Sequence, residues 1–282
     1  MFIPGITTRS SRSSSSKRRL GLTSFRIGSL GLSKIANIVS IGSSVISIIQ
    51  QGLPFAGRSL GGGQRPQIFG NQTYGSGYGD QDDTRGVAGR NFPFYFWPVV
   101  WDSNLLLPGR KGAYLNAQSE YGGVGNDARP GGVLSTARIT SRINPSTIFT
   151  LLSDSNTVIS LVSQLVDECP SDSDFNDELN AVTPLSPNAT TPRPEQVVQY
   201  YRASSIALTL DGYNNTATYA AAGAPNTPLP SGIDTTLLNC VNGTIGKYAP
   251  LVTDGGLMAS WTPSFINLVG LAGALWALLL FT

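Results

Sequence analysis

The chain has 282 residues, of which 32 are glycine, 18 are proline and 13% are charged, a composition unlike that of a uniformly packed enzyme. It contains no histidine, which excludes Ser-His-Asp and Cys-His nucleophilic catalysis and the usual imidazole metal sites. Nine Lys and Arg residues and no acidic residue precede Asp80. Residues 80–282 contain the other ten bases and all 17 acids, so their net charge is −7. The chain therefore joins two electrostatically different regions.

Residues 1–34 form a basic, Ser- and Arg-rich region, and residues 35–53 contain an apolar run. This order is typical of a signal sequence or signal anchor, which would place the following residues in the lumen of the secretory pathway. On a helical wheel the Ile and Val side chains share one half and Asn and Ser the other, so an amphipathic interfacial helix is a second interpretation. An organellar transit peptide is a third. We expect these bases to set topology or to contact anionic lipid, and we expect no nucleic-acid partner.

Residues 54–132 form a glycine- and aromatic-rich segment. Because glycine loses much backbone entropy on ordering, we expect loops and short extended pieces here. The aromatic run of residues 92–101 is predicted to pack onto the helical region that follows. A second interpretation makes its side chains a contact surface for sugar rings or partner proteins, and a third places the run at a membrane surface. The contact residues would be Phe94, Tyr95, Trp97 and Trp101.

Three carboxylates near the aromatic run, Asp102, Glu120 and Asp127, are the candidates for an acid and base pair of a glycosidase. Their spacing does not favour that role over the role of ordinary solvated carboxylates. We therefore expect a chain without catalytic activity, and the alternative is a surface carbohydrate-active enzyme.

Residues 133–253 are predicted to be a helical ectodomain with three helices. The first begins at Asn144-Pro145 and ends at Cys169, because apolar residues recur between them at helical spacing. The second begins near Pro194 and includes Tyr200 and Tyr201. Residues 204–210 either continue it or form a strand, before a turn at residues 211–212. The third follows a capping box at residues 231–234.

The two cysteines, Cys169 and Cys240, lie 71 positions apart without a CxxC spacing. This favours one disulfide formed in an oxidising compartment, and two buried free thiols are the alternative. The disulfide would tie the end of the first helix to the third. Four N-x-Thr sequons lie between the apolar ends of the chain, where lumenal residues are expected. Their acceptors are Asn71, Asn188, Asn214 and Asn242.

Residues 254–282 resemble a GPI-attachment signal. Small residues at Asp254 and Gly255 are the expected lipid-attachment site, residues 257–264 the spacer, and the uncharged residues 265–282 the apolar tail. A retained membrane span and a soluble core helix are the alternatives.

Two stretches resemble cofactor-binding motifs, but each lacks a residue that its motif requires. The run that begins at Asp172 resembles a calcium loop, but Asp177 stands where the glycine is required. The glycines of residues 57–63 are followed by Gln64, where a phosphate loop needs Lys. We expect no metal and no cofactor.

Several stretches together resemble a family of uncharacterised, GPI-anchored surface proteins of basidiomycete fungi. They are GRSLGGGQR, YGSGYG, RGVAGRNFPFYFWPVVW, EYGG, RPGG and YYRASSIALTLDGYNNT. The resemblance implies a place at the cell surface and no particular chemistry. We therefore expect a mainly α protein: a small disulfide-tied helical domain, a long irregular segment rich in glycine and aromatic residues, and apolar helices at both ends. Its predicted function is that of a membrane-anchored extracytosolic glycoprotein that contacts wall polysaccharide or surface proteins, with an intracellular tail-anchored protein as another alternative.

Overall fold

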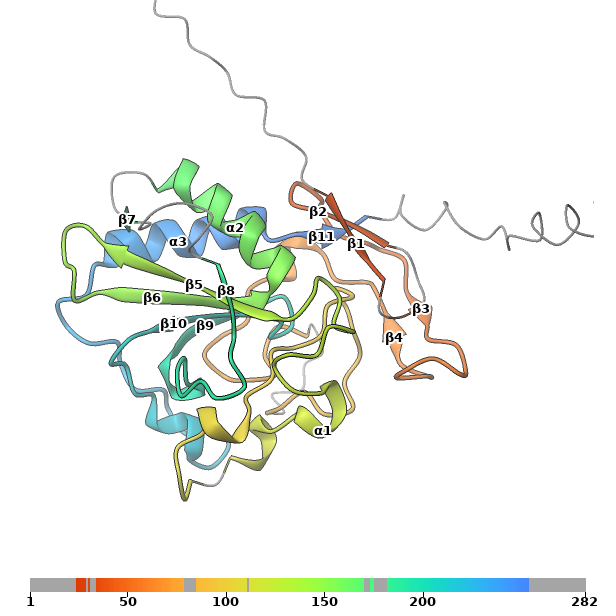
Figure 1. Ribbon diagram of the computed structural model, residues 1–282, viewed down its shortest axis with the longest axis horizontal. Coiled ribbons are helices and arrows are strands. Elements are labelled where there is room, and N and C mark those ends of the chain that lie inside the picture. Colours follow the sequence, from red (N-terminus) through yellow and green to blue (C-terminus); the bar gives the residue numbers. More distant parts are fainter. Residues whose placement is uncertain are drawn as a thin grey trace, which may run out of the picture.

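The computed structural model describes residues 24–28, 30, 34–78, 85–110, 112–169, 173–174 and 182–253. The strands form three sheets with antiparallel pairing (Figure 1). They are β1 Ser24–Ile27, β2 Lys34–Asn37, β3 Ser47–Ile48, β4 Ser59–Leu60, β5 Leu134–Ser141, β6 Ile148–Asp154, β7 Ser173–Asp174, β8 Thr183–Pro184, β9 Val197–Tyr201, β10 Ile206–Leu210 and β11 Leu251–Val252. The α-helices are α1 Gln118–Tyr121, α2 Ser155–Glu168 and α3 Thr235–Tyr248. The prediction of a mainly α fold is wrong, because helix and strand contribute 23% and 22% and the sheets organise the core.

The largest sheet has the order β7-β5-β6-β10-β9, and β8 also pairs with β5. Helices α2 and α3 lie together on one face of this sheet (Figure 1). Successive side chains of a strand point to opposite faces, so Tyr201 donates from its hydroxyl to Asn242 of α3, while the hydroxyl of Tyr200 accepts from the indole nitrogen of Trp101. The aromatic run therefore covers the face opposite the helices.

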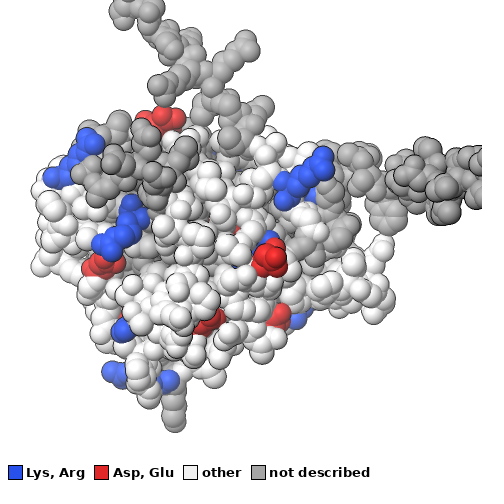
Figure 2. All heavy atoms as spheres, in the orientation of Figure 1, with Lys and Arg blue, Asp and Glu red and all other residues white. Residues whose placement is uncertain are grey.

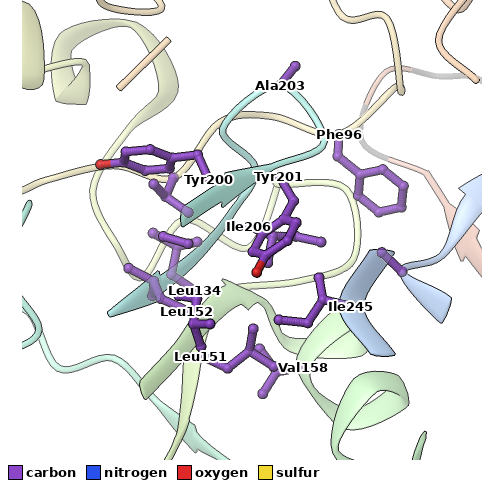
Figure 3. Close-up of a cluster of buried hydrophobic side chains, with 14 of the residues drawn as sticks. Phe96, Leu134, Leu151, Leu152, Val158, Tyr200, Tyr201, Ala203, Ile206 and Ile245 are labelled. Carbon is purple, nitrogen blue, oxygen red and sulfur yellow. The ribbon is translucent and has the colours of Figure 1, made fainter. Parts of the chain in front are cut away.

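The core consists of two apolar layers on either side of this sheet. Leu151 lies with Val158 of α2 and Ile245 of α3, whereas the next residue, Leu152, lies on the side of Tyr200 (Figure 3). Both layers are buried. The core cluster contains residues from both sides of position 132, so the glycine- and aromatic-rich segment and the region after it share one core.

A buried arginine in the turn between β9 and β10 joins several elements. The Arg202 guanidinium lies 2.8 Å from the carboxylate of Asp154, donates to the hydroxyl of Thr157 at 3.1 Å and to the carbonyl of Pro250 at 3.0 Å, and stacks 3.4 Å from the ring centre of Phe96. Asp154 also caps α2 by accepting from the backbone nitrogen of Thr157. One cation thus connects β6, α2, the residue before β11 and the aromatic run.

The first predicted helix is a strand in its first half. Asn144 and Pro145 form the turn between β5 and β6, where the side-chain oxygen of Asn144 accepts from the hydroxyl of Ser146. An Asn-Pro pair suits a turn as well as a helix start. The helix begins at Ser155, after the cap Asp154, and ends where predicted, at Cys169.

The second predicted helix is also wrong. Pro194 opens a single 3-10 turn that ends at Gln196, and the residues after it form β9. Paired Val and Tyr residues favour a strand, and pairing with β10 stabilises it. Residues 204–210 contain β10, and Gly212 has the positive φ of a turn. The third helix is confirmed as α3, but its cap is Asp234, three residues later than the predicted capping box at residues 231–234 places it.

The apolar run of residues 35–53 does not form a helix. It contains the end of β2 and the whole of β3, separated by Gly42 with a φ of +107°. Ile and Val favour strands, and β2 is held between β1 and β11. The expected helix of residues 254–282 and the basic residues 1–23 lie outside the described residues.

Candidate functional site

Two glycine-containing stretches, residues 59–63 and 77–78, meet residues 91–94 of the aromatic run at one surface groove. It has a volume of about 210 Å³. We refer to it as the glycine–aromatic groove. Its lining comprises Ile46, Ser59, Gly61, Gly62, Gly63, Gln67, Gly77, Tyr78, Asn91, Pro93 and Phe94.

Close backbone contact forms the base of this groove. The backbone nitrogens of Gly61 and Gly63 donate to the carbonyls of Phe92 and Pro93, each at 2.9 Å. A Cβ on Gly61 would lie 2.2 Å from the carbonyl oxygen of Val45, and one on Gly63 would lie 2.7 Å from the ring of Phe94. Glycine is therefore required here so that the strands on either side can approach.

The groove is lined by uncharged side chains. The side-chain oxygens of Asn91 and Gln67 accept from backbone nitrogens at 3.0 Å, so their amide nitrogens remain available as donors. Arg90 covers one face of the Tyr78 ring, at 4.7 Å from its centre. Aromatic and apolar walls with a few amide donors are the surroundings that bind small neutral polar molecules.

The predicted contact residues lie in the core. Phe94, Tyr95, Trp97 and Trp101 are 3%, 1%, 4% and 0% exposed. Only Phe94 lines the groove, and Trp101 donates to Tyr200 at 3.1 Å. The aromatic run is therefore buried against the residues that follow it, as predicted, but Trp101 contacts strand β9 and not a helix, and the run offers little surface for a partner. The groove was missed because its lining comes from stretches that sequence reasoning treated separately.

The three candidate carboxylates have different surroundings. Glu120 accepts from the guanidinium of Arg58 and from the backbone nitrogen of Gly89, and Asp127 is exposed. Asp102 is buried, and desolvation raises its pKa although the backbone nitrogen of Val124 donates to it. None of the three lines the glycine–aromatic groove. The contacts of Glu120 and Asp102 are those of carboxylates that support the fold.

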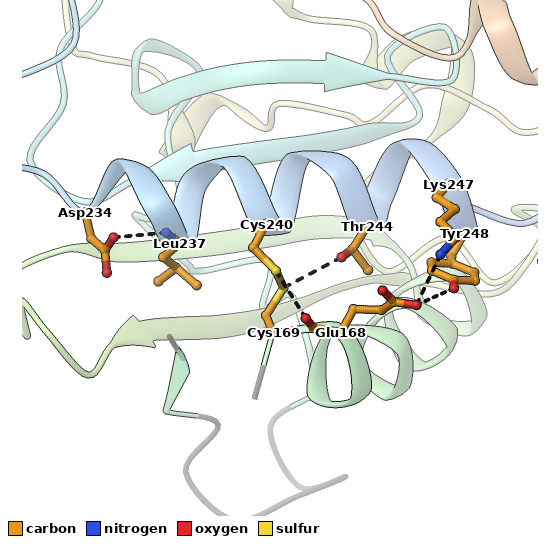
Figure 4. Close-up of a disulfide and its surroundings, with 8 residues drawn as sticks. All are labelled: Glu168, Cys169, Asp234, Leu237, Cys240, Thr244, Lys247 and Tyr248. Carbon is orange, nitrogen blue, oxygen red and sulfur yellow. Dashed lines mark hydrogen bonds and ion pairs between the residues drawn. A yellow bond between two sulfur atoms is a disulfide. The ribbon is translucent and has the colours of Figure 1, made fainter. Parts of the chain in front are cut away.

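The disulfide between Cys169 and Cys240 is present and connects the end of α2 to α3 (Figure 4). The Cα atoms of the two cysteines are 6.0 Å apart. Glu168, the residue before the bridge, accepts from Tyr248 and Lys247 at the end of α3. These hydrogen bonds, led by that of Tyr248, lower the pKa of Glu168. The two helices are therefore joined covalently and by hydrogen bonds.

The four sequons differ in accessibility. Asn71, Asn188 and Asn214 are exposed. Asn242 lies in α3, is half-buried and accepts from the hydroxyl of Tyr201 at 2.8 Å. Asn188 and Asn214 lie outside helices and strands, as glycosylated sites do. The predicted lipid-attachment residues Asp254 and Gly255 lie outside the described residues.

Comparison with protein-family models, with curated proteins and with solved structures finds no match. Within the described residues, none of the helices has the length and apolar character that crossing a bilayer requires. The same residues contain no cluster of Cys, Asp and Glu with the arrangement of a metal site.

Proposed function

We propose that this chain is a non-catalytic glycoprotein of the cell surface, exported through the secretory pathway and held there by a membrane anchor. The observation that carries the proposal is the Cys169–Cys240 disulfide, because such bonds persist in oxidising compartments. The exposed acceptors Asn188 and Asn214 support it. The anchor itself is inferred from the uncharged residues 265–282.

The glycine–aromatic groove is proposed as the site through which the protein binds a neutral glycan of the cell wall. No Asp, Glu, Lys or Arg lines it, which disfavours a charged ligand. The amide nitrogens of Asn91 and Gln67 can donate to sugar hydroxyls, and the accessible side chains of Ile46 and Pro93 can contact the apolar face of a sugar. The contact role is thereby moved from the aromatic run to this groove.

Membrane attachment is tested by treating intact producing cells with a phosphatidylinositol-specific phospholipase and analysing the released protein by mass spectrometry. We expect release, with a C-terminal peptide that ends at Asp254 or Gly255 and carries the glycan remnant of the anchor. A peptide that extends to Thr282 on unreleased protein would instead show a retained span. Soluble cytosolic protein with reduced Cys169 and Cys240 would overturn the proposal.

Glycan binding is tested with purified protein and insoluble wall polysaccharide in a sedimentation assay. Gln67→Ala removes an exposed amide of the groove, and we expect at least about a tenfold loss of affinity, the value of one good hydrogen bond to a desolvated ligand. Gln118→Ala removes an exposed amide outside the groove and serves as the matched control. Equal binding by both variants would remove the groove from the proposal.

A further inference from the structure

Large aliphatic side chains are exposed mainly in one stretch of the chain. Six of the ten exposed large hydrophobic residues in the described part lie between positions 35 and 48. Three of them, Ile41, Ile46 and Ile48, are 78%, 64% and 61% exposed. Contiguous exposed apolar surface is typical of protein or membrane contact sites. We refer to these six residues as the aliphatic face: Ile35, Val39, Ile41, Val45, Ile46 and Ile48.

Buried and outward positions alternate from Lys34 to Ile41, through β2 and the four residues after it, and the buried positions include Ala36 and Ile38. Lys34 is buried, with its amine 5.4 Å from the ring centre of Tyr95, and Ser40 is also buried. Ile35, Val39 and Ile41 occupy the alternate, outward positions. An antiparallel sheet with one side in water normally shows polar residues on that side. Three of the four outward positions of this segment are therefore aliphatic, Asn37 being the fourth, and such a surface suits an apolar environment.

The aliphatic face is fixed to the body of the protein. Arg65 donates to the carbonyls of Ile38 and Ser40 and to that of Ala249, at 3.0, 2.6 and 2.6 Å. Strand β2 also pairs with β11. The exposure of these side chains is therefore a property of the packed fold.

A basic residue lies beside this face, on the neighbouring strand. The sequence has no acidic residue before Asp80, and Arg26 is exposed on β1, the neighbour of β2. In the view of Figure 2 the lobe formed by β3 and β4 is almost free of charged side chains. An apolar surface with basic residues beside it is complementary to a bilayer with anionic lipids.

The anchor inferred above follows this sheet directly. Val252 of β11 lies two positions before Asp254 and 13 positions before residue 265. Thirteen extended residues span at most about 45 Å, and two span about 7 Å. Since β11 pairs with β2, either form of anchor keeps the aliphatic face within reach of the bilayer.

We propose that the aliphatic face lies on the surface of the bilayer that holds the anchor, with Ile41 and Ile48 in the boundary between headgroups and acyl chains and Arg26 near anionic headgroups. This inference rests on the proposed membrane anchor and adds an orientation to it. Ile46 also lines the glycine–aromatic groove, so the groove opens at the edge of the membrane contact. The turn between β5 and β6, which contains Ile143, lies at the other end of the molecule (Figure 1).

The test uses the full chain purified from producing cells and reconstituted in liposomes of phosphatidylcholine and phosphatidylserine that contain a photoreactive phospholipid. After irradiation, lipid adducts are located by mass spectrometry. We expect at least tenfold more adducts in residues 35–48 than at Ile143, which is 71% exposed and serves as the control surface. Ile41→Asp with Ile48→Asp should reduce the adducts in residues 35–48 at least fivefold, whereas Ile143→Asp should leave them unchanged.

Flotation of the protein with the liposomes reports on the anchor separately. Protein that floats but carries no more adducts in residues 35–48 than at Ile143 would overturn the orientation and leave the anchor standing. Protein that does not float would overturn both. If the aliphatic face is unlabelled and the floated protein cross-links as a dimer through residues 35–48, a second copy covers it and the lipid assignment is wrong.

Discussion

Removal of the buried guanidinium by Arg202→Met should destabilise the fold more than any change at an exposed ion pair. Arg202 is 0% exposed and its partner Asp154 is 3% exposed. Burial lowers the pKa of Arg202 to about 10, so the side chain remains protonated at neutral pH. Breaking a buried pair leaves an uncompensated charge and costs about 3–5 kcal/mol. Domains are stable by about 5–15 kcal/mol, so this variant would lose a large share of its stability.

Urea titration followed by near-ultraviolet circular dichroism measures the loss. Arg138→Met is the matched control. Arg138 and Asp211 form an ion pair at 3.2 Å, but their side chains are 64% and 38% exposed. We therefore expect this variant to lose less than about 1 kcal/mol of its free energy of unfolding. In the double variant with Asp154→Asn, the two losses should be less than additive, because each change removes the same contact. An Arg202→Met protein within about 1 kcal/mol of the wild type would refute the reasoning.

Three further predictions concern the disulfide, a buried carboxyl and a helix cap. Replacing Cys169 and Cys240 by Ser should lower the free energy of unfolding by about 4 kcal/mol, because the closed loop spans 71 positions; an unchanged urea midpoint would contradict this. Asp102→Asn should raise the free energy of unfolding at pH 7 and change it little at pH 3. The pKa of the folded carboxyl is raised above 3.8, so the contribution of Asp102 to the stability of the protein falls as the pH rises through that pKa. A variant less stable than the wild type at pH 7 would count against this. Asp234→Ala should cost about 1 kcal/mol of thermal stability through loss of the cap on α3, and an equal melting temperature would disprove this role.

Local signals predicted α3, the end of α2 and the turn at residues 211–212, because each depends on residues close in sequence. The polar residues at 231–234 and the apolar positions at helical spacing after them predict α3 without knowledge of its neighbours, although the helix begins three residues later than the capping box indicates. By contrast, Asp154 is both the last residue of β6 and the cap of α2. Neither role can be predicted without knowing that β5 pairs with β6. Val197 and Tyr201 fit a helical pattern as well as a strand, and β10 decides between the two.

The candidate sites were less accessible to sequence reasoning. Arg202 gave no signal because its partners Asp154 and Pro250 are each 48 positions away. The glycines of residues 61–63 predicted loops and short extended pieces, but the groove forms only when Tyr78 and Asn91 are brought beside them. The apolar run of residues 35–49 was predicted to be helical because its Ile and Val residues share one half of a helical wheel, but the same residues also suit the strands β2 and β3 that they form.

The central claim, that residues 35–253 are exported and oxidised, is tested most directly by peptide mass spectrometry of the protein isolated from its own cells under conditions that block thiol exchange. The account predicts a Cys169–Cys240 disulfide peptide and N-linked glycan on Asn188 and Asn214, with lower occupancy of the half-buried Asn242. Free thiols at both cysteines together with unmodified asparagines at all four sequons would contradict it.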